Sequence, residues 1–328
     1  MLDLKHEQGM QVFLQLVSKA DVLIESFRPG VMERLELGYE QLSQCNARLI
    51  YVALTGYGQD GPYAQKAGHD LNYAALGGLL HPTNVTKPSP LGVQLADVSG
   101  AQHAMIGILL TLLARERTGQ GQKVDISILE SILPLLTVPL AEYAATGKPE
   151  RAGFLAGKYA CYTIYEAGDG RFLALGALEQ KFWSSFCAVI GCEKLIPEQF
   201  AETKQPDLIA TVGAVFKRKT ADQWLALFHN VDTCITPVND VAALLRDPQL
   251  AARQAFAELE GARASVRQLG AAPKLSQTPG SVGGRPPLLG EHTHEILTTA
   301  GFFDSEISEL VRLGIVHLAP PVEPRTSF

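Results

Sequence analysis

Two short, almost uninterrupted apolar segments constrain the fold of this chain more than any other feature. The first runs from Asp21 to Glu25 and the second from Leu49 to Leu54, with helical patterns between them. Apolar residues at nearly every position are typical of strands buried on both faces, as in a parallel sheet covered by helices. Ligands of such sheets bind beyond the carboxyl ends of the strands. The sequence therefore predicts an α/β fold with a binding site after these two segments.

The residues that follow the two strands suit an anionic ligand. Arg28 follows the first strand, and Arg34 lies about two turns further on, in a helix that Pro29 is expected to open. The second strand runs into the loop Thr55–Pro62, where Gly56 and Gly58 would let the backbone approach a ligand. Arginines at this edge could hold phosphates or carboxylates. Solvated surface arginines and an ordinary tight turn remain the alternative interpretation.

Three ionisable residues, each in its own local motif, are the acid–base candidates. His69 lies in the segment Gly68–Tyr73, Asp97 follows Leu95 and Ala96, and Glu179 closes the segment Leu175–Glu179. Each has an ordinary alternative: a hydrogen-bonded turn histidine, a capping aspartate and a solvated glutamate. We expect Asp97 to lie near the N-cap of a long helix from Val98 to Arg115, where backbone amides favour negative charge.

The middle of the chain predicts a second, smaller domain. After a loop at 146–157, strands at 161–165 and 171–175 flank an Asp-Gly hairpin signal at 168–170. We predict a large domain over 1–145 and a small domain over 158–260. Residues 261–328 are predicted to form a return linker and C-terminal helices at 291–300 and 305–313 that pack on the large domain.

Composition narrows the functional classes. The chain has 328 residues, of which 46% are apolar and 19% charged, and a net charge of −6. Without a long basic run, this argues against a nucleic-acid partner. The five cysteines form no CxxC pair, which favours reduced thiols without a metal site. The apolar run 126–145 contains Glu130, Glu142 and two prolines, so we expect a buried or interface helix, no membrane span and a cytoplasmic protein.

Five motifs follow one another along the chain: Ala20–Gly30, Leu49–Tyr51, Gly56–Pro62, Thr118–Asp125 and Pro287–Thr293. Together they resemble the family III CoA-transferases, a superfamily that includes alpha-methylacyl-CoA racemase. The segments Gly68–Tyr73 and Gly176–Glu179 resemble the racemase branch, whereas Asp97 matches a position that both branches share. The resemblance covers essentially the whole chain.

The resemblance implies a Rossmann-like large domain built from both chain ends, a smaller α+β domain and an interlocked homodimer. Each active site would lie between the large domain of one chain and the small domain of the other. Coenzyme A would enter as part of the acyl-CoA substrate, with no permanently bound cofactor. The residues implied to bind it are Arg28, Arg34, Gly56, Gly58, Gly68, Asp70 and Tyr73.

The racemase chemistry explains the three acid–base candidates. A thioester acidifies its α-hydrogen, and racemisation needs a base on each face of the enolate, for which His69 and Asp97 are suited. Glu179 would orient His69, and the helix end after Asp97 would stabilise the enolate oxygen. The alternative is a CoA-transferase, in which Asp97 is a covalent nucleophile that forms an aspartyl-CoA thioester.

Two departures from the resembled chains lead to a third hypothesis. Their Leu-Asp-Leu-Lys stretch follows an earlier strand and helix, whereas here it is Leu2–Lys5, so the first βα unit is expected to be missing. Glu36 stands where relatives usually have glycine. Either the recorded start is too late, or the chain is a shortened, noncatalytic paralogue, although the presence of His69, Asp97 and Glu179 argues against the latter.

Overall fold

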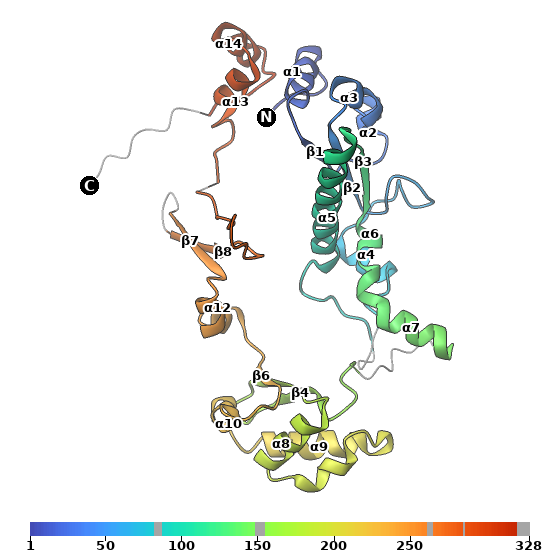
Figure 1. Cartoon of the computed structure of the whole chain (residues 1–328), viewed down its shortest axis with the longest axis vertical. Coiled ribbons are helices and arrows are strands. Elements are labelled where there is room, and N and C mark those ends of the chain that lie inside the picture. The colour runs from blue at the N-terminus through green and yellow to red at the C-terminus, as the bar shows by residue number, and fades with distance from the viewer. Residues whose placement is uncertain (82–86, 148–154, 261–264, 285, 320–328) are drawn as a thin grey trace, which may run out of the picture. The chain divides into compact units, whose positions relative to one another are not determined.

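A computed structural model describes residues 1–81, 87–147, 155–260, 265–284 and 286–319 of the chain (Figure 1). The chain divides into two compact units. Unit 1 comprises Met1–His81, Pro88–Val138 and Pro286–Phe328, and unit 2 comprises Pro82–Lys87 and Pro139–Arg285.

Unit 1 is built on a parallel sheet. Strands β1 (Val22–Glu25), β2 (Ile50–Thr55) and β3 (Lys123–Ser127) pair in the order β1-β2-β3, with Val22 beside Ile50 and Tyr51 beside Lys123. Every backbone pair is parallel because helices carry the chain back between consecutive strands. The predicted α/β class is confirmed.

Helices cover both faces of this sheet. Tyr51 and Ala53 of β2 pack with a cluster that includes Val17, at the end of α1 (Glu7–Val17), and Leu42 of α3 (Tyr39–Cys45). The alternate residues Ile50 and Val52 pack against Ala104 and Ile108 of α5 (Leu95–Thr118). The short helix α2 (Val31–Arg34) lies on the α1 side through Met32. Because strand side chains alternate, one apolar strand serves two cores.

The two ends of the chain meet in unit 1. Val12 of α1 is buried with Leu297 of α13 (Thr293–Ala300) and with Ile307 and Leu310 of α14 (Asp304–Arg312). The Gln15 side chain donates to the carbonyl of Ala300 over 2.8 Å.

The longest helix starts earlier than predicted. α5 begins at Leu95 instead of Val98 and ends at Thr118, and its C-cap residue Gly119 has a left-handed φ of 74°. One short helix precedes α5 in the chain, α4 (Asp70–Leu76). After β3 the chain continues with α6 (Ile128–Ser131), the 3-10 turn η1 (Leu133–Leu136) and α7 (Thr137–Thr146).

Two helical stretches, Leu95–Thr118 and Ile128–Thr146, are long and apolar enough to cross a membrane by length and composition alone. Only 33% and 17% of their apolar windows are buried. An apolar stripe on α5 is correspondingly exposed and consists of Ile106, Leu109, Leu110 and Leu113.

Unit 2 combines an antiparallel sheet with helices. β4 (Tyr162–Glu166), β5 (Phe172–Gly176) and β6 (Ile235–Pro237) pair in that order, and Gly170 in the β4–β5 turn has a φ of 82°. The expected Asp-Gly hairpin is therefore confirmed. One face of the sheet packs on the helical segments α8 (Gln180–Val189), η2 (Glu193–Glu198), α9 (Gln205–Phe216) and α10 (Ala221–Phe228). The 3-10 turn η3 (Glu202–Lys204) precedes α9.

The stretch predicted as a return linker contains a strand. After α11 (Val241–Leu244) and α12 (Pro248–Ala252), β7 (Phe256–Glu260) pairs with β8 (Ser265–Leu269) in an antiparallel hairpin. The mixture of polar and apolar residues in β8 gives little indication of a strand in the sequence. In the hairpin, Arg267 forms an ion pair with Glu258 over 2.7 Å. Most of the loop predicted at 146–157 lies outside the described residues.

Candidate active site

A cavity of about 330 Å³ lies in unit 1, where β1 and β2 end. Its walls come from the turn after β1, the loop after β2, the segment before α4, Tyr73 and Ile128. Parallel strands bring their carboxyl ends to one edge, so segments distant in sequence meet there. Of the predicted site residues, the cavity brings together Arg28, Gly56, Gly68, His69 and Tyr73.

The ring of Tyr73 explains why positions 56 and 68 are glycine. Its ring is 7% exposed, and its hydroxyl donates to the carbonyl of Gly68 over 2.7 Å. A Cβ on Gly56 would come within 2.3 Å of that hydroxyl, and one on Gly68 within 2.7 Å of the ring. Both positions therefore need glycine to let the backbone pack on the ring. Gly58 is left-handed, with a φ of 87°. The binding of CoA by these residues stays a prediction.

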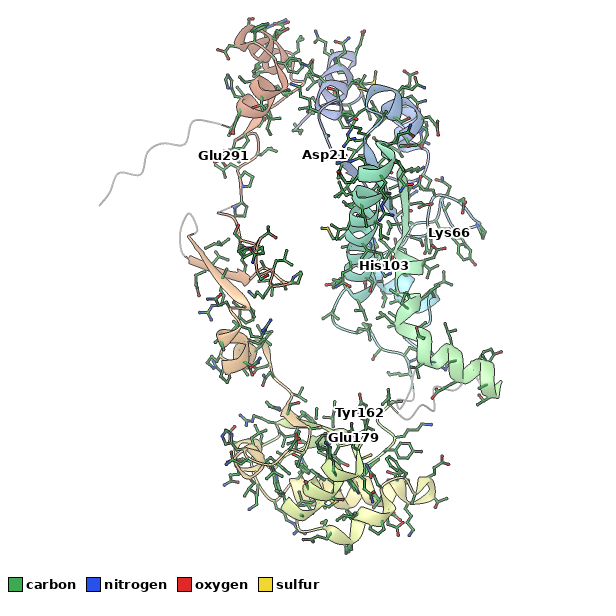
Figure 2. All side chains as sticks on the ribbon, viewed as in Figure 1. Asp21, Lys66, His103, Tyr162, Glu179 and Glu291 are labelled. Atoms are coloured by element: carbon green, nitrogen blue, oxygen red, sulfur yellow. The ribbon has the colours of Figure 1, made fainter. Side chains whose placement is uncertain are left out.

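Cations line the cavity. Arg28 is exposed in the turn after β1, and Lys66 reaches the cavity from the loop before α4, with its ammonium 3.9 Å from the centre of the Tyr63 ring (Figure 2). Sequence reasoning missed Lys66, although a basic residue three positions before His69 was a usable signal. Arg34 is not among the described residues that line this cavity. One of its terminal guanidinium nitrogens lies near Gly30.

His69 stands at the start of α4. It is the N-cap residue, its side chain is exposed, and its backbone N–H donates to the side-chain oxygen of Asn72 over 3.1 Å. This bond holds the backbone of His69 in place, and His69 forms part of the cavity wall. The imidazole is thus accessible to a ligand in the cavity.

Asp97 lies inside the first turn of α5, two residues after its start, and is exposed. The N-cap is Gln94, so Asp97 does lie near the N-cap, but the helix starts three residues earlier than predicted. The helix can start early because Asp70, the first residue of α4, accepts the N–H groups of Ala96 and Asp97 on one carboxylate oxygen, at 2.7 and 3.1 Å. A carboxylate at a helix start is favoured by the free amides and the helix dipole.

The expected role of this helix end in holding an enolate oxygen is wrong. The amides of Leu95 and Val98 donate to the carbonyls of Val93 and Gln94 at 3.0 Å each. With Ala96 and Asp97 bonded to Asp70, all four first-turn amides are occupied. A backbone N–H supplies one donor, so this turn offers none to a substrate.

The charge of His69 affects the pKa of Asp97. Desolvation raises the pKa of the Asp97 carboxyl above its usual range, the charge of Asp70 raises that pKa further, and His69 lowers it. The pKa of Tyr73 is also raised, first by burial, then by Tyr57 and by Asp97. His69, Asp70, Tyr73 and Asp97 therefore form one electrostatically coupled group in unit 1.

Glu179 belongs to unit 2, so its pairing with His69 stays a prediction. It is the exposed N-cap residue of α8 (Figure 2), and its backbone oxygen accepts the amides of Phe182 and Trp183 at 3.0 and 3.1 Å. Its charge raises the pKa of the Cys234 thiol, after the larger effects of desolvation and Asp232.

A larger cavity of about 590 Å³ lies in unit 2, against the sheet face opposite the helices. Among the described residues, its lining contains neither a histidine nor a carboxylate, only neutral groups such as Ile164, Ala174 and Cys234. We therefore assign the candidate chemistry to the smaller cavity of unit 1. In the described part of the chain no three His, Cys, Asp or Glu side chains are grouped to hold a metal ion.

Known proteins share this arrangement of motifs along nearly the whole chain. The sequence profile described as CoA-transferase family III matches residues 1–293. The chain belongs to CoA-transferase family III. Family III members are acyl-CoA racemases or CoA-transferases, which makes the chain an enzyme of this class.

Relatives of both chemistries are almost equally similar to this family III chain. Alpha-methylacyl-CoA racemase from Mus musculus is 37% identical over 94% of this chain and 82% of the relative. An acyl-CoA transferase from Fusarium pseudograminearum is 36% identical over 96% of this chain and 72% of the relative. Overall identity therefore does not choose between racemase and transferase.

A solved structure has the same fold. The crystal structure of a CaiB/BaiF family protein from Brucella suis matches with a TM-score of 0.80 and 29% identity, over 91% of this chain and 80% of that one. The interlocked dimer implied by the family resemblance stays a prediction.

Proposed function

We propose that the chain racemises 2-methylacyl-CoA thioesters by removing the α-proton and returning a proton to the opposite face. One observation carries this proposal: His69 lines the cavity after β1 and β2, and its charge acts directly on the carboxyl of Asp97. Among the residues that the structure describes, Asp97 does not itself line this cavity, so the pair consists of one base at the cavity wall and a second that is linked to it electrostatically. Two such groups are the minimal machinery for proton exchange next to a carbonyl.

The two groups suit opposite roles. The thioester carbonyl acidifies the α-hydrogen, so one group accepts that proton while the other, in its protonated form, delivers one to the other face of the enolate. A general base works best when its pKa lies near the working pH. The raised pKa of Asp97 moves the carboxyl in that direction. Glu179 is proposed to orient His69 and fix its tautomer.

The cavity suits the CoA part of the substrate. Arg28 and Lys66 bring positive charge to it in a chain with a net charge of −6. Guanidinium and ammonium groups at a strand edge are suited to phosphates, and the glycine loop allows the backbone to approach them. Arg34 is proposed to act on CoA from outside this cavity. CoA enters as part of the substrate, and we propose no permanently bound cofactor.

A CoA-transferase is the second candidate. The 36% identical acyl-CoA transferase favours it, as does the exposure of Asp97 at the start of α5. Asp97 would then be the nucleophile that carries CoA as an aspartyl thioester between two carboxylic acids. This route has no evident need for His69, which is why we prefer the racemase.

We further propose that the chain is a cytoplasmic homodimer. The α5 stripe Ile106, Leu109, Leu110 and Leu113 is between 50% and 63% exposed, and contiguous apolar surface of this kind marks an interaction site. A second copy would cover it, as the family resemblance implies, and would bring a second Glu179 to the assembly.

The experiment is incubation with a 2-methylacyl-CoA in D2O, with α-deuterium measured by mass spectrometry. We expect incorporation by the wild type and a loss of about 10²–10⁴-fold in rate in His69→Asn and Asp97→Asn. The controls His229→Asn and Asp240→Asn change the same residue types in unit 2 and should exchange normally.

Other outcomes separate the alternatives. CoA transfer to a free carboxylate that is lost in Asp97→Asn, without deuterium incorporation, would establish the transferase instead. A folded dimer that neither exchanges nor transfers, and does not bind CoA, would leave the noncatalytic paralogue.

A further inference from the structure

Asp70 occupies a bridging position between the two acid–base candidates. It follows His69 directly in the chain as the first residue of α4. Its carboxylate accepts the backbone N–H of Asp97 over 3.1 Å and that of Ala96 over 2.7 Å. One side chain therefore links the backbone that carries the imidazole to the backbone that carries the carboxyl.

This bond replaces a local cap of α5. Gln94, the N-cap residue, makes no side-chain capping bond in the described structure. Ser, Thr, Asp or Asn at the N-cap normally accepts these amides from within the same chain segment. Here the acceptor comes from another helix, 26 and 27 positions earlier in sequence. The start of α5 is thereby fixed to the start of α4, and Ala96 beside it is fully buried.

We propose that Asp70 is a positioning residue that holds Asp97 at a fixed place relative to His69. The inference rests on the proposed proton exchange, for which the two bases must face opposite sides of one enolate. Small displacements of catalytic groups lower rates strongly, so a rigid link between the two helix starts has a direct kinetic consequence. Asp70 itself is not assigned a proton transfer.

The charge of Asp70 adds a second effect at the same place. Asp70 and Asp97 are like charges, and Asp70 raises the pKa of Asp97 whereas His69 lowers it. Tyr73 of α4 also faces this group, through the charge of Asp97 on its hydroxyl. α6, which packs against α5, carries Glu130, but the charges that shift Asp97 are those of Asp70 and His69.

The sign of the pH effect follows. Exchange that needs ionised Asp97 declines as the pH falls through the pKa of this carboxyl, and Asp70 sets that decline at a higher pH. Removal of the Asp70 charge lowers the pKa of Asp97, so the acidic limb of the rate profile moves to lower pH.

The test compares Asp70→Ala and Asp70→Asn with a matched capping aspartate. Asp247 accepts the amides of Gln249 and Leu250 on one oxygen at 2.9 and 3.1 Å, at the start of α12 in unit 2. It is the same capping chemistry without an acid–base neighbour. Asp247→Ala and Asp247→Asn therefore report what the loss of a cap alone does.

We expect Asp70→Ala to lower kcat for deuterium exchange by about 10–100-fold with KM nearly unchanged, because the link is lost. Asp70→Asn keeps an acceptor oxygen, so we expect it to lose less of the rate than Asp70→Ala, with the acidic limb moved to lower pH. Both Asp247 variants should keep the wild-type rate and profile. Carboxyl titration of Asp97 by ¹³C NMR supplies a readout that does not depend on activity.

Two results would contradict different proposals, the positioning role of Asp70 and the racemase activity. If the wild type exchanges but Asp70→Ala behaves like Asp247→Ala and the Asp97 titration is unmoved, Asp70 is only a cap. If the wild type shows no exchange, the proposed racemase is refuted. An unmoved Asp97 titration in Asp70→Asn would then also refute the electrostatic link.

Discussion

Unit 1 and unit 2 bury their apolar residues in opposite ways. In unit 2 the aromatic rings of Tyr165, Phe186, Phe216 and Trp224 belong to one continuous buried cluster, with neighbouring centroids 5.1–6.0 Å apart. In unit 1 the described residues form several smaller clusters, on both faces of the sheet and between the chain ends. The long helix α5 keeps an apolar stripe exposed. Unit 2 therefore gathers its buried aromatic residues in one core, whereas unit 1 divides its buried residues among several.

The same contrast applies to chemistry. The parallel sheet of unit 1 brings several strand ends to one edge, and there His69 and two cations line a cavity. The antiparallel sheet of unit 2 presents a face, and the cavity on it is lined by neutral described residues. Parallel topology gathers side chains from distant segments at one edge, which is why candidate catalysis concentrates in the unit with the more divided core.

The largest expected effect tests the single core of unit 2. Phe216 is fully buried and stacks on Tyr165 at 5.2 Å. Replacement by alanine leaves a cavity, and we expect Phe216→Ala to cost about 3–5 kcal/mol in the free energy of unfolding. Urea denaturation measures it, and Phe200→Ala, at a 47% exposed ring, is the control. A cost below that of the control would contradict a continuous core.

The next effect tests the exposed stripe of unit 1. We expect Leu109→Lys to weaken self-association by about 10–100-fold, because a charge would enter a desolvated contact. Analytical ultracentrifugation over a dilution series measures the dissociation constant. Val241→Lys, at an apolar residue of unit 2 that is 72% exposed, is the matched control. Equal association by both variants would show that α5 is not the interface.

The smallest effect concerns the backbone beside the Arg34 helix. Glu36 has a φ of 57°, in the left-handed region that a residue with a Cβ disfavours. We expect Glu36→Gly to raise the free energy of unfolding by about 1 kcal/mol, because glycine adopts this conformation readily. Thermal denaturation checks it, with Glu40→Gly inside α3 expected to destabilise. A destabilised Glu36→Gly would mean that the carboxylate makes a compensating interaction.

The fold class and most elements of unit 1 were predictable from local sequence. Continuous apolar runs predict buried parallel strands, and the Asp-Gly turn at 168–170 predicts the β4–β5 hairpin, because both depend on neighbouring residues. The strand β8 was missed because its residues 265–269 are stabilised by pairing with β7, which lies outside its own sequence. Pairing energy of that kind leaves little trace in composition.

The candidate site, like the fold, was predictable only in part from the sequence. The sequence by itself determined which groups are available: an imidazole at 69, carboxylates at 70, 97 and 179, and arginines after the first strand. Only the tertiary structure decided that Asp70 holds the first turn of α5, that Asp97 lies within that turn, and that Tyr73 fills the space beside Gly56 and Gly68. These are contacts between segments brought together by the parallel sheet, and a hydrogen bond across 27 positions has no periodicity or spacing from which to predict it.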